Sequence, residues 1–287
     1  MERARQIAIV GMIVSGLLAA LKITTGILAH SAALSADGFE SAADVFTSGL
    51  VLVGLTLAAR PADENHPYGH GRVEILTGLL LGFLLACAGA AIAWHGLTGA
   101  ADETHVPASW AVWPLVVSIG AKFGLMVLKS SYGRKIGSSS LLADAVNDSI
   151  DTLSGVVALV AVSVTLMDPD RFLRADHIGA FAVGVIVICS ACRVIYESGM
   201  HLMDTMPDER SMKKIREVAL SVADVAGVEK CFARKTGLKY HVDLHLEVDP
   251  EITVRASHEI AQRVRDRIRQ QLPWVADVLV HVEPWPG

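Results

Sequence analysis

The sequence predicts an α-helical membrane protein with six transmembrane helices, followed by a small cytoplasmic α+β domain. Of its 287 residues, 52% are hydrophobic and 19% are charged, and the mean hydropathy is +0.44. Soluble domains are less apolar and more charged than this. The apolar segments stop near residue 207, and a charged, amphipathic stretch follows. We therefore expect a transmembrane domain over residues 1–207 and a cytoplasmic regulatory and dimerisation domain over residues 208–287.

Six apolar segments are long enough to cross a bilayer, which takes about 20 mostly apolar residues for each helix. The predicted spans are residues 7–29, 33–59, 73–97, 109–130, 138–167 and 176–202. Lys and Arg in short loops favour the cytoplasmic side of a membrane. Arg60 and Arg72 lie in the connection between the second and third spans, and Lys129, Arg134 and Lys135 are assigned to the connection between the fourth and fifth. Both termini are therefore predicted to be cytoplasmic.

The region after residue 207 alternates helical and strand patterns. "PDERSMKKIREVALSV" has a helical period, and "YHVDLHLEV" alternates strictly between apolar and polar residues. "HEIAQRVRDRIRQQL" is helical again, and "DVLVHVEP" is a final strand. With a further strand near 228–235, the order is αββαβ, which predicts a sandwich with its helices on one face of the sheet.

Acidic and amide side chains recur at helical spacing within the second and fifth predicted spans. They are Asp37, Glu40, Asp44, Asp144, Asn147, Asp148 and Asp151. Offsets of three, four and seven residues fall on one helix face, so each span carries a polar stripe. A charge at mid-membrane costs at least about 2.5–3.5 kcal/mol, so such a residue faces a partner, a cavity or a transport path.

Basic partners for these acids are scarce in the sequence. Lys22 and Lys122 are the only lysines well inside the predicted spans, so we expect a bound cation or protons to balance much of the acidic charge. For Asp37 and Asp144, which lie about one turn closer to the helix starts, helix capping or local hydrogen bonding is an equal alternative to a functional role.

Two pairs of residues four apart suggest a metal site. Glu40 and Asp44 on the second span, facing Asn147 and Asp151 on the fifth, would offer four oxygen donors. Such donors suit a hard or borderline divalent cation. The alternative is a network of protonated acids and amides that joins the two helices.

The loop "RPADENHPYGHGRVE", residues 60–74, carries a second candidate site. Asp63, His66 and His70 are spaced three and four residues apart. Imidazole and carboxylate groups at this spacing suit zinc or a similar ion. The alternative is an ordinary turn whose shape is set by Pro67 and Gly69.

Taken together, these motifs resemble those of the cation diffusion facilitator family of divalent-metal/proton antiporters. The resemblance rests on the six spans, the loop "HPYGHGRVE", the paired polar residues on the second and fifth helices, and the αββαβ domain, which resembles a metallochaperone fold. It implies a homodimer, embedded in the lipid bilayer, that exports metal from the cytoplasm by alternating access, driven by inward proton flow. The expected location is a bacterial inner (plasma) membrane.

Matched position by position, the resemblance implies several functional sites. The transport site would be Glu40, Asp44, Asn147 and Asp151, with Asp148 as a candidate fifth donor, and the cytoplasmic loop site would be Asp63, His66 and His70. The interfacial metal positions of the cytoplasmic domain fall on Glu229, His245, His258, His281 and Glu283. An intersubunit charge interlock would map onto Arg72 and Asp204.

The strand pattern supports part of the last metal site independently. His281 and Glu283 share one strand face, and His245 lies on the polar face of its own strand. For His258, on a predicted helix, an ordinary solvated histidine is an equal alternative.

The transport quartet departs from the commonest family pattern. Zinc carriers of the family usually place at least one histidine in it, and this chain has none. Oxygen donors alone favour Fe²⁺ or Mn²⁺, although Zn²⁺ also accepts carboxylates. A metal-responsive channel or sensor that uses the same ligands without proton coupling is the alternative function.

Other function classes are disfavoured by the sequence. It lacks an HExxH motif, a Ser or Cys nucleophile motif and a Gly-rich phosphate loop, so we do not expect an enzyme. We expect no cofactor beyond bound divalent metal ions. The net charge of −5 argues against a nucleic-acid partner.

Overall fold

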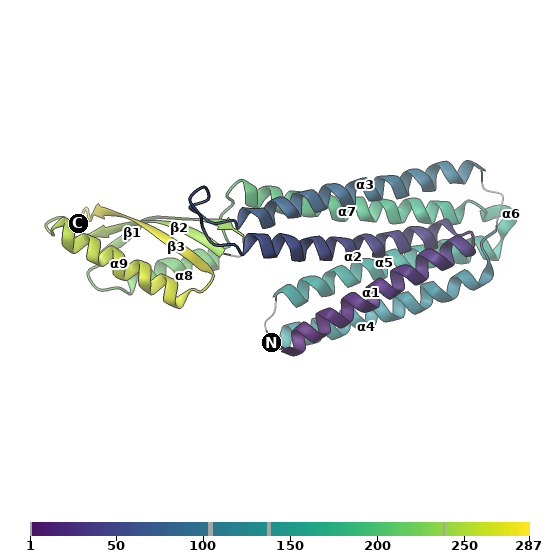
Figure 1. Ribbon diagram of the computed structural model, residues 1–287, viewed down its shortest axis with the longest axis horizontal. Helices are drawn as coiled ribbons and strands as arrows, with labels where there is room; N and C mark the ends of the chain where they lie inside the picture. The colour runs from purple at the N-terminus through teal and green to yellow at the C-terminus, as the bar shows by residue number, and fades with distance from the viewer. Residues whose placement is uncertain (1, 103–105, 137–138, 238) are drawn as a thin grey trace. The chain divides into compact units, whose positions relative to one another are not determined.

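The structure is a computed structural model that describes residues 2–102, 106–136, 139–237 and 239–287 (Figure 1). Its long helices are α1 (Glu2–Leu28), α2 (Ala32–Ala58), α3 (Arg72–Asp102), α4 (Val112–Ile136), α5 (Ser139–Met167) and α7 (Ala175–Leu202). Each coincides with one predicted span to within a few residues. The predicted start of the fifth span, Ser138, lies outside the described residues. The fold class predicted from the sequence is therefore confirmed.

Five of the described helices, all except α2, are long and apolar enough to cross a membrane. The remaining long helix, α2, also has 27 residues, but it carries Asp37, Glu40 and Asp44. Length and composition alone support five spans, and α2 is the sixth long helix of the same domain.

Two short elements connect the long helices, η1 (Ser109–Ala111) and α6 (Pro169–Phe172). The transmembrane core is made of small and branched side chains, including Leu34, Leu115 and Val183, all fully buried. Glycines bring α3 and α7 into close contact: a Cβ on Gly184 would lie 2.6 Å from the backbone nitrogen of Ala93. Small residues at such crossings allow helix backbones to approach in a membrane.

The chain forms two compact units. One contains residues 1–50 and 80–194, and the other contains residues 51–79 and 195–287. The second unit therefore combines the C-terminal domain with the chain segments at one end of α2, α3 and α7. The metal-site residues predicted on α2 and α5 all belong to the first unit, and those of the loop and the C-terminal domain belong to the second.

The C-terminal domain has the predicted αββαβ order. Its elements are α8 (Glu209–Leu220), β1 (Gly227–Thr236), β2 (Lys239–Val248), α9 (Val254–Gln271) and β3 (Val275–Pro284). The strands form one sheet in the order β1-β2-β3, in which β1 and β2 are antiparallel and β2 and β3 are parallel. Asp208 caps α8, because its side chain accepts a hydrogen bond from the backbone N–H of Ser211 at 2.9 Å.

Both helices of this domain cover the same face of the sheet (Figure 1). The alternation predicted in β2 is confirmed: Val242, Leu244 and Leu246 are buried against Ile215 of α8 and Val264 of α9. The intervening polar residues of β2 consequently lie on the opposite, open face of the sheet.

One extra residue sets the register of β3. Tyr240 pairs with Val275, but the next residue of β2, His241, pairs with Asp277, so Ala276 has no counterpart. Such an insertion is a β-bulge, which shifts the pairing of every residue after it. As a result His245 lies opposite His281.

Candidate metal-binding sites

Helix α2 carries a glutamate that is buried within the first unit. Glu40 is 6% exposed, and its Oε1 accepts a hydrogen bond from the hydroxyl of Ser154 on α5 at 2.8 Å. Within the part of the chain that the structure describes, Glu40 Oε2 is buried and has no hydrogen-bond partner. A buried polar atom left unpaired costs about 1–3 kcal/mol. This oxygen is therefore well placed to bind a cation or a proton.

A cavity of about 190 Å³ lies where α1, α2, α4 and α5 meet. Its polar lining consists of Ser15, Asp44, Lys122, Lys129, Asp144, Asn147 and Asp148. The structure thus brings Asp44 of α2 and Asn147 of α5, two of the predicted transport ligands, to one cavity. Asp151, one turn further along α5, is 4% exposed.

Two lysines of α4 form ion pairs with the acids of α5. Lys122 Nζ lies 3.3 Å from Asp148 Oδ1 and forms a closer ion pair with Asp151. Lys129 Nζ lies 2.9 Å from Asp144 Oδ2 and 2.6 Å from Asp148 Oδ2. Both lysine side chains are buried. Protein cations therefore neutralise part of the acidic stripe of α5.

A third buried lysine neutralises the first acid of α2. Lys22 of α1 lies 2.8 Å from Asp37 Oδ2, and its ammonium group donates a hydrogen bond to Ser41 at 2.6 Å. Removing two charges from water is costly, and the pairing offsets much of that cost. Asp37 therefore acts as the counter-ion of a buried lysine.

One expectation from the sequence is wrong here. Counter-charge is not limited to Lys22 and Lys122, because α4 continues to Ile136 and carries Lys129 into the interior as well. For Asp37 and Asp144, where helix capping was an equal alternative to a functional role, each carboxylate forms an ion pair with a buried lysine. The physical reason is that a carboxylate inside the bilayer region gains more from an ammonium than from a backbone N–H.

The loop between α2 and α3 gathers its three predicted ligands. Asp63 Oδ1 lies 3.0 Å from Nδ1 of His66, and Asp63 Oδ2 lies 3.4 Å from Nε2 of His70. One ligand atom from each residue lies within 4.8 Å of the others. Side-chain and backbone hydrogen bonds from His66 lower the pKa of Asp63 below its ordinary value, so this carboxylate stays ionised. The cluster can provide two imidazoles and one carboxylate to an ion such as zinc.

The same loop packs against the β1–β2 turn through two glycines. A Cβ on Gly71 would lie 2.4 Å from the carbonyl oxygen of Thr236, so the backbones approach more closely than any side chain allows. Gly237 has a φ of 73° and lies against Gly71. Nearby, the ring of Tyr68 meets the ring of His241 edge-on, with 6.0 Å between centroids. These contacts hold the histidine loop on the C-terminal domain.

The residues predicted for the charge interlock also meet. Arg72, at the start of α3, lies 3.1 Å from Asp204 Oδ1, just after α7. The two side chains are 52% and 42% exposed. This ion pair is formed within one chain, and its exposure leaves both groups accessible.

The open face of the sheet carries the second metal cluster. His245 Nδ1 lies 2.5 Å from Glu283 Oε1, and His281 Nε2 lies 3.7 Å from the same oxygen. Ligand atoms of the three residues lie within 4.8 Å of one another. The bulge in β3 makes this possible, because it places His281 opposite His245 on the central strand.

The other two residues predicted for this site differ in their positions. Glu229 lies beside Glu283, and a hydrogen bond between them, followed by one from His245, lowers the pKa of Glu283 below its ordinary value. Glu229 also forms an ion pair with Lys230 at 3.1 Å. His258 is exposed on α9, the helix that covers the other face of the sheet. Within the described residues it is not part of the cluster.

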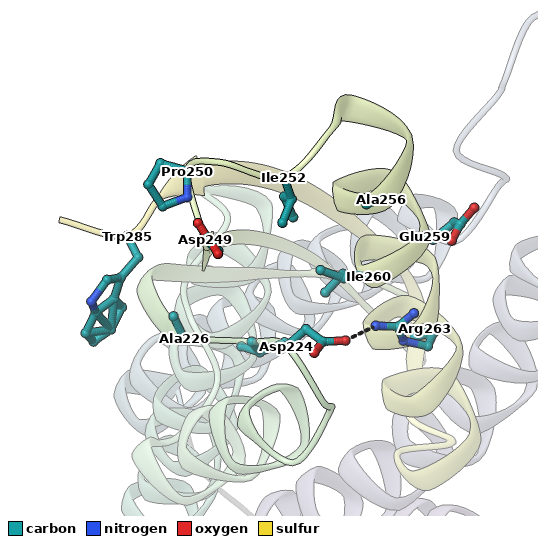
Figure 2. A pocket seen from close by; sticks show the side chains of 11 residues that line it. Asp224, Ala226, Asp249, Pro250, Ile252, Ala256, Glu259, Ile260, Arg263 and Trp285 are labelled. Carbon is teal, nitrogen blue, oxygen red and sulfur yellow. Dashed lines mark hydrogen bonds and ion pairs between the residues drawn. The ribbon is translucent and has the colours of Figure 1, made fainter. Parts of the chain in front are cut away.

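A cavity of about 660 Å³ in the C-terminal domain is lined by residues outside these clusters (Figure 2). It is bounded by α9, by the turns before β1 and after β2, and by Trp285 after β3, with Ile252 and Ile260 among its apolar lining. Asp224 and Arg263 form an ion pair of 2.8 Å at one side of it. Its lining residues differ from the predicted metal ligands.

Known protein families match nearly the whole chain. Residues 8–203 match the cation efflux transmembrane domain, and residues 207–285 match the cytoplasmic domain of cation efflux proteins. The chain belongs to the cation efflux family. This is the cation diffusion facilitator family that the sequence motifs predicted, and its members are metal transporters rather than enzymes.

Individual cation efflux relatives extend over most of the chain. Metal tolerance protein C1 of Arabidopsis thaliana is 31% identical over 93% of this chain, which spans 59% of the plant protein. The manganese efflux system protein MneP of Bacillus subtilis is 27% identical, covering 98% of this chain and 96% of MneP. An uncharacterized transporter of Methanocaldococcus jannaschii is 31% identical, covering 98% of both chains.

Sequence reasoning missed three residues near the acids that it predicted for the transport site of this cation efflux protein. Ser154 donates to Glu40, and Ser15 accepts from the ammonium group of Lys122 at 2.8 Å. The third, Lys129, could have been found, because it follows Lys122 by seven residues and so shares its helix face. The serines carry no such signal, because apolar helices contain many serines that bond only to their own backbone.

Proposed function

We propose that this protein exports a divalent transition-metal cation from the cytoplasm in exchange for protons, as a homodimer that works by alternating access. The proposed transport ligands are Glu40, Asp44, Asn147 and Asp151, with Asp148 as a further candidate donor. The observation that carries the proposal is the buried Oε2 of Glu40, which has no hydrogen-bond partner among the described residues. Glu40 lies four residues before Asp44 on α2, and Asp44 lines a cavity together with acids of α5. The protein would lie in a bacterial inner membrane with both termini in the cytoplasm.

Mn²⁺ or Fe²⁺ is the favoured cargo, with Zn²⁺ a weaker candidate. Three carboxylates and one amide provide oxygen donors alone, and oxygen donors favour the harder members of the divalent series. The name of MneP, a manganese efflux protein, gives this preference additional support.

Proton exchange follows from the chemistry of the ligands. A carboxylate must be deprotonated to bind a metal, so protons and metal compete for the same oxygens. Protons that enter from the outside would displace the metal there. On the cytoplasmic side, their release would restore the site.

The test is metal uptake into proteoliposomes that contain the purified protein, with a pH gradient imposed across the membrane. We expect Mn²⁺ uptake that follows the gradient and is lost in Asp44→Ala and in Asp151→Ala. Glu251→Gln, an exposed residue beyond β2, is the matched control and should transport as the wild type does. Normal transport by Asp44→Ala would refute the site. Flux that ignores the gradient would instead indicate a channel.

We further propose that cytoplasmic metal at His245, His281 and Glu283 joins two C-terminal domains and favours the transporting state. Support comes from the location of the cluster on an open sheet face, where a second subunit can add ligands. Sedimentation of the full-length protein in detergent, with and without Mn²⁺ or Zn²⁺, tests this. We expect metal to compact or stabilise the dimer of the wild type but not that of His245→Ala.

A further inference from the structure

The ammonium group of Lys122 occupies the position next to a proposed transport ligand. It forms its closest ion pair with Asp151, donates to the hydroxyl of Ser15 at 2.8 Å, and lies 3.3 Å from Asp148 Oδ1. Lys122 and Asp151 are 2% and 4% exposed. Water therefore contributes little to the balance of charge here.

A metal ion and this ammonium group would compete for one carboxylate. Asp151 offers two oxygens, and its Oδ2 already contacts Lys122 Nζ. An ammonium group and a divalent ion held on the same carboxylate would repel each other strongly in a medium of low dielectric constant. Binding of the metal at Asp151 thus requires that Lys122 move away.

We propose that Lys122 is a tethered counter-cation of the transport site, which a divalent metal displaces from Asp151 and which keeps monovalent cations out. This inference rests on the proposed function, because it takes Asp151 to be a transport ligand. It makes Lys122 a residue that determines cation selectivity.

The charge of the incoming ion explains the selectivity. A monovalent cation brings the same charge as the ammonium group but lacks the advantage of being attached to the site, where its effective concentration is high. A divalent cation doubles the Coulomb attraction to the carboxylates. Na⁺ and K⁺ should therefore fail to displace Lys122, whereas Mn²⁺ should succeed.

The structure also provides a place for the displaced group. Lys122 already contacts Ser15 of α1 and Asp148 of α5, so a small rotation of its side chain releases Asp151 and keeps two partners. Asp148 also forms an ion pair with Lys129, with 2.6 Å between Oδ2 and Nζ. An acid shared between two lysines can take up the charge that leaves Asp151.

The experiment is calorimetric titration of MnCl₂ into full-length protein in lipid nanodiscs. The Asp44→Ala isotherm, which reports the other metal clusters, is subtracted. We expect Lys122→Gln to bind Mn²⁺ about tenfold more tightly at the transport site, since one buried competitor has been removed. Replacing choline by Na⁺ at constant ionic strength should weaken Mn²⁺ binding in Lys122→Gln but not in the wild type.

Two further variants keep the test decisive. Lys122→Arg retains the positive charge, and an arginine side chain can bind a carboxylate through two parallel hydrogen bonds. This variant should therefore bind Mn²⁺ more weakly than the wild type. This result can be read even if Lys122→Gln does not fold. Lys129→Gln, on the same helix and in the same cavity, should change the affinity less than Lys122→Gln does.

Several outcomes would overturn the inference. The inference fails if Lys122→Gln binds Mn²⁺ as tightly as the wild type or more weakly and shows no sensitivity to Na⁺. It also fails if Lys122→Arg binds Mn²⁺ as tightly as the wild type or more tightly. An equal gain in Lys129→Gln would show a general field effect instead of direct occupancy. If Asp44→Ala binds as the wild type does, the proposed transport site itself fails, and the inference fails with it.

Discussion

The carboxylate of Asp176, in the first turn of α7, holds the start of α2 through Ser31. Asp176 Oδ1 accepts a hydrogen bond from the Ser31 hydroxyl at 2.8 Å, and Oδ2 accepts one from the backbone N–H of Ala32 at 2.5 Å. Ser31 in turn accepts a hydrogen bond from the N–H of Leu34 at 3.2 Å. Ser31, which precedes α2, and Asp176 of α7 therefore together cap one helix whose acids form half of the proposed transport site.

Replacing Asp176 should destabilise the protein. We expect Asp176→Asn to cost about 2 kcal/mol, because it replaces a buried charged acceptor of several hydrogen bonds by a weaker one. Thermal unfolding in detergent measures the change as a lower Tm. Asp170→Asn, an exposed acid nearby, is the control and should leave the Tm unchanged. Equal Tm values for the two variants would show that the cap contributes nothing.

The buried pair of Lys22 and Asp37 should behave as a unit. Lys22→Met leaves a buried carboxylate without its cation, which we expect to cost about 3–5 kcal/mol. The double variant Lys22→Met with Asp37→Leu should recover most of the lost stability, because apolar side chains of similar volume replace both charges. The Tm of each variant, measured by thermal unfolding, tests this prediction. A double variant as unstable as the single one would contradict a purely structural role for the pair.

The contact between Gly71 and Gly237 predicts a strong effect of a single methyl group. Gly237→Ala should destabilise the C-terminal domain by about 1 kcal/mol or more, because φ is 73° and the new Cβ would lie 2.8 Å from the Gly71 carbonyl oxygen. Gly199→Ala, where a Cβ meets nothing within 4 Å, is the matched control. Limited proteolysis of the histidine loop should accelerate in Gly237→Ala alone.

Metal binding by the cluster of His245, His281 and Glu283 should depend on pH in a defined direction. The imidazoles bind metal only when neutral, so affinity should rise from pH 5.5 to pH 7.5. Hydrogen bonds from Glu229 and His245 lower the pKa of Glu283 below its ordinary value, which favours the ionised carboxylate. Titrations of Zn²⁺ at the two pH values measure the effect, and Glu283→Gln should weaken binding at both. Affinity independent of pH would argue against histidine ligation.

Apolar length and strand alternation predicted much of the fold. Runs of about 20 apolar residues located the long helices, and strict alternation in β2 assigned Val242 and Leu244 to the core. These patterns can be recognised in the sequence because the buried part of a helix or strand requires apolar residues along the whole element. The bulge at Ala276 was not predictable, since it depends on pairing between strands that are distant in sequence.

The candidate site was predictable in its acids but not in its cations. Glu40, Asp44 and the polar residues of α5 are detectable because charges are rare inside apolar helices. Lys129 was assigned to a loop because it lies at the end of an apolar run, where a lysine normally reaches the membrane surface. In the structure Lys129 lies against Gly11 of α1, where the missing side chain leaves room for it.

The extra residue in β3 has a consequence for the metal cluster of the sheet. If Ala276 paired with His241 in a regular ladder, His245 would lie opposite Val280 instead of His281, and the second imidazole would move one strand position away. Because adjacent residues of a strand point to opposite faces, that shift would also turn His281 and Glu283 toward the helices. The relative positions of the three ligands on this face thus depend on the bulge at Ala276, which is not itself a ligand. A one-residue insertion between Val278 and His281 would have the same effect while every ligand remained in the sequence.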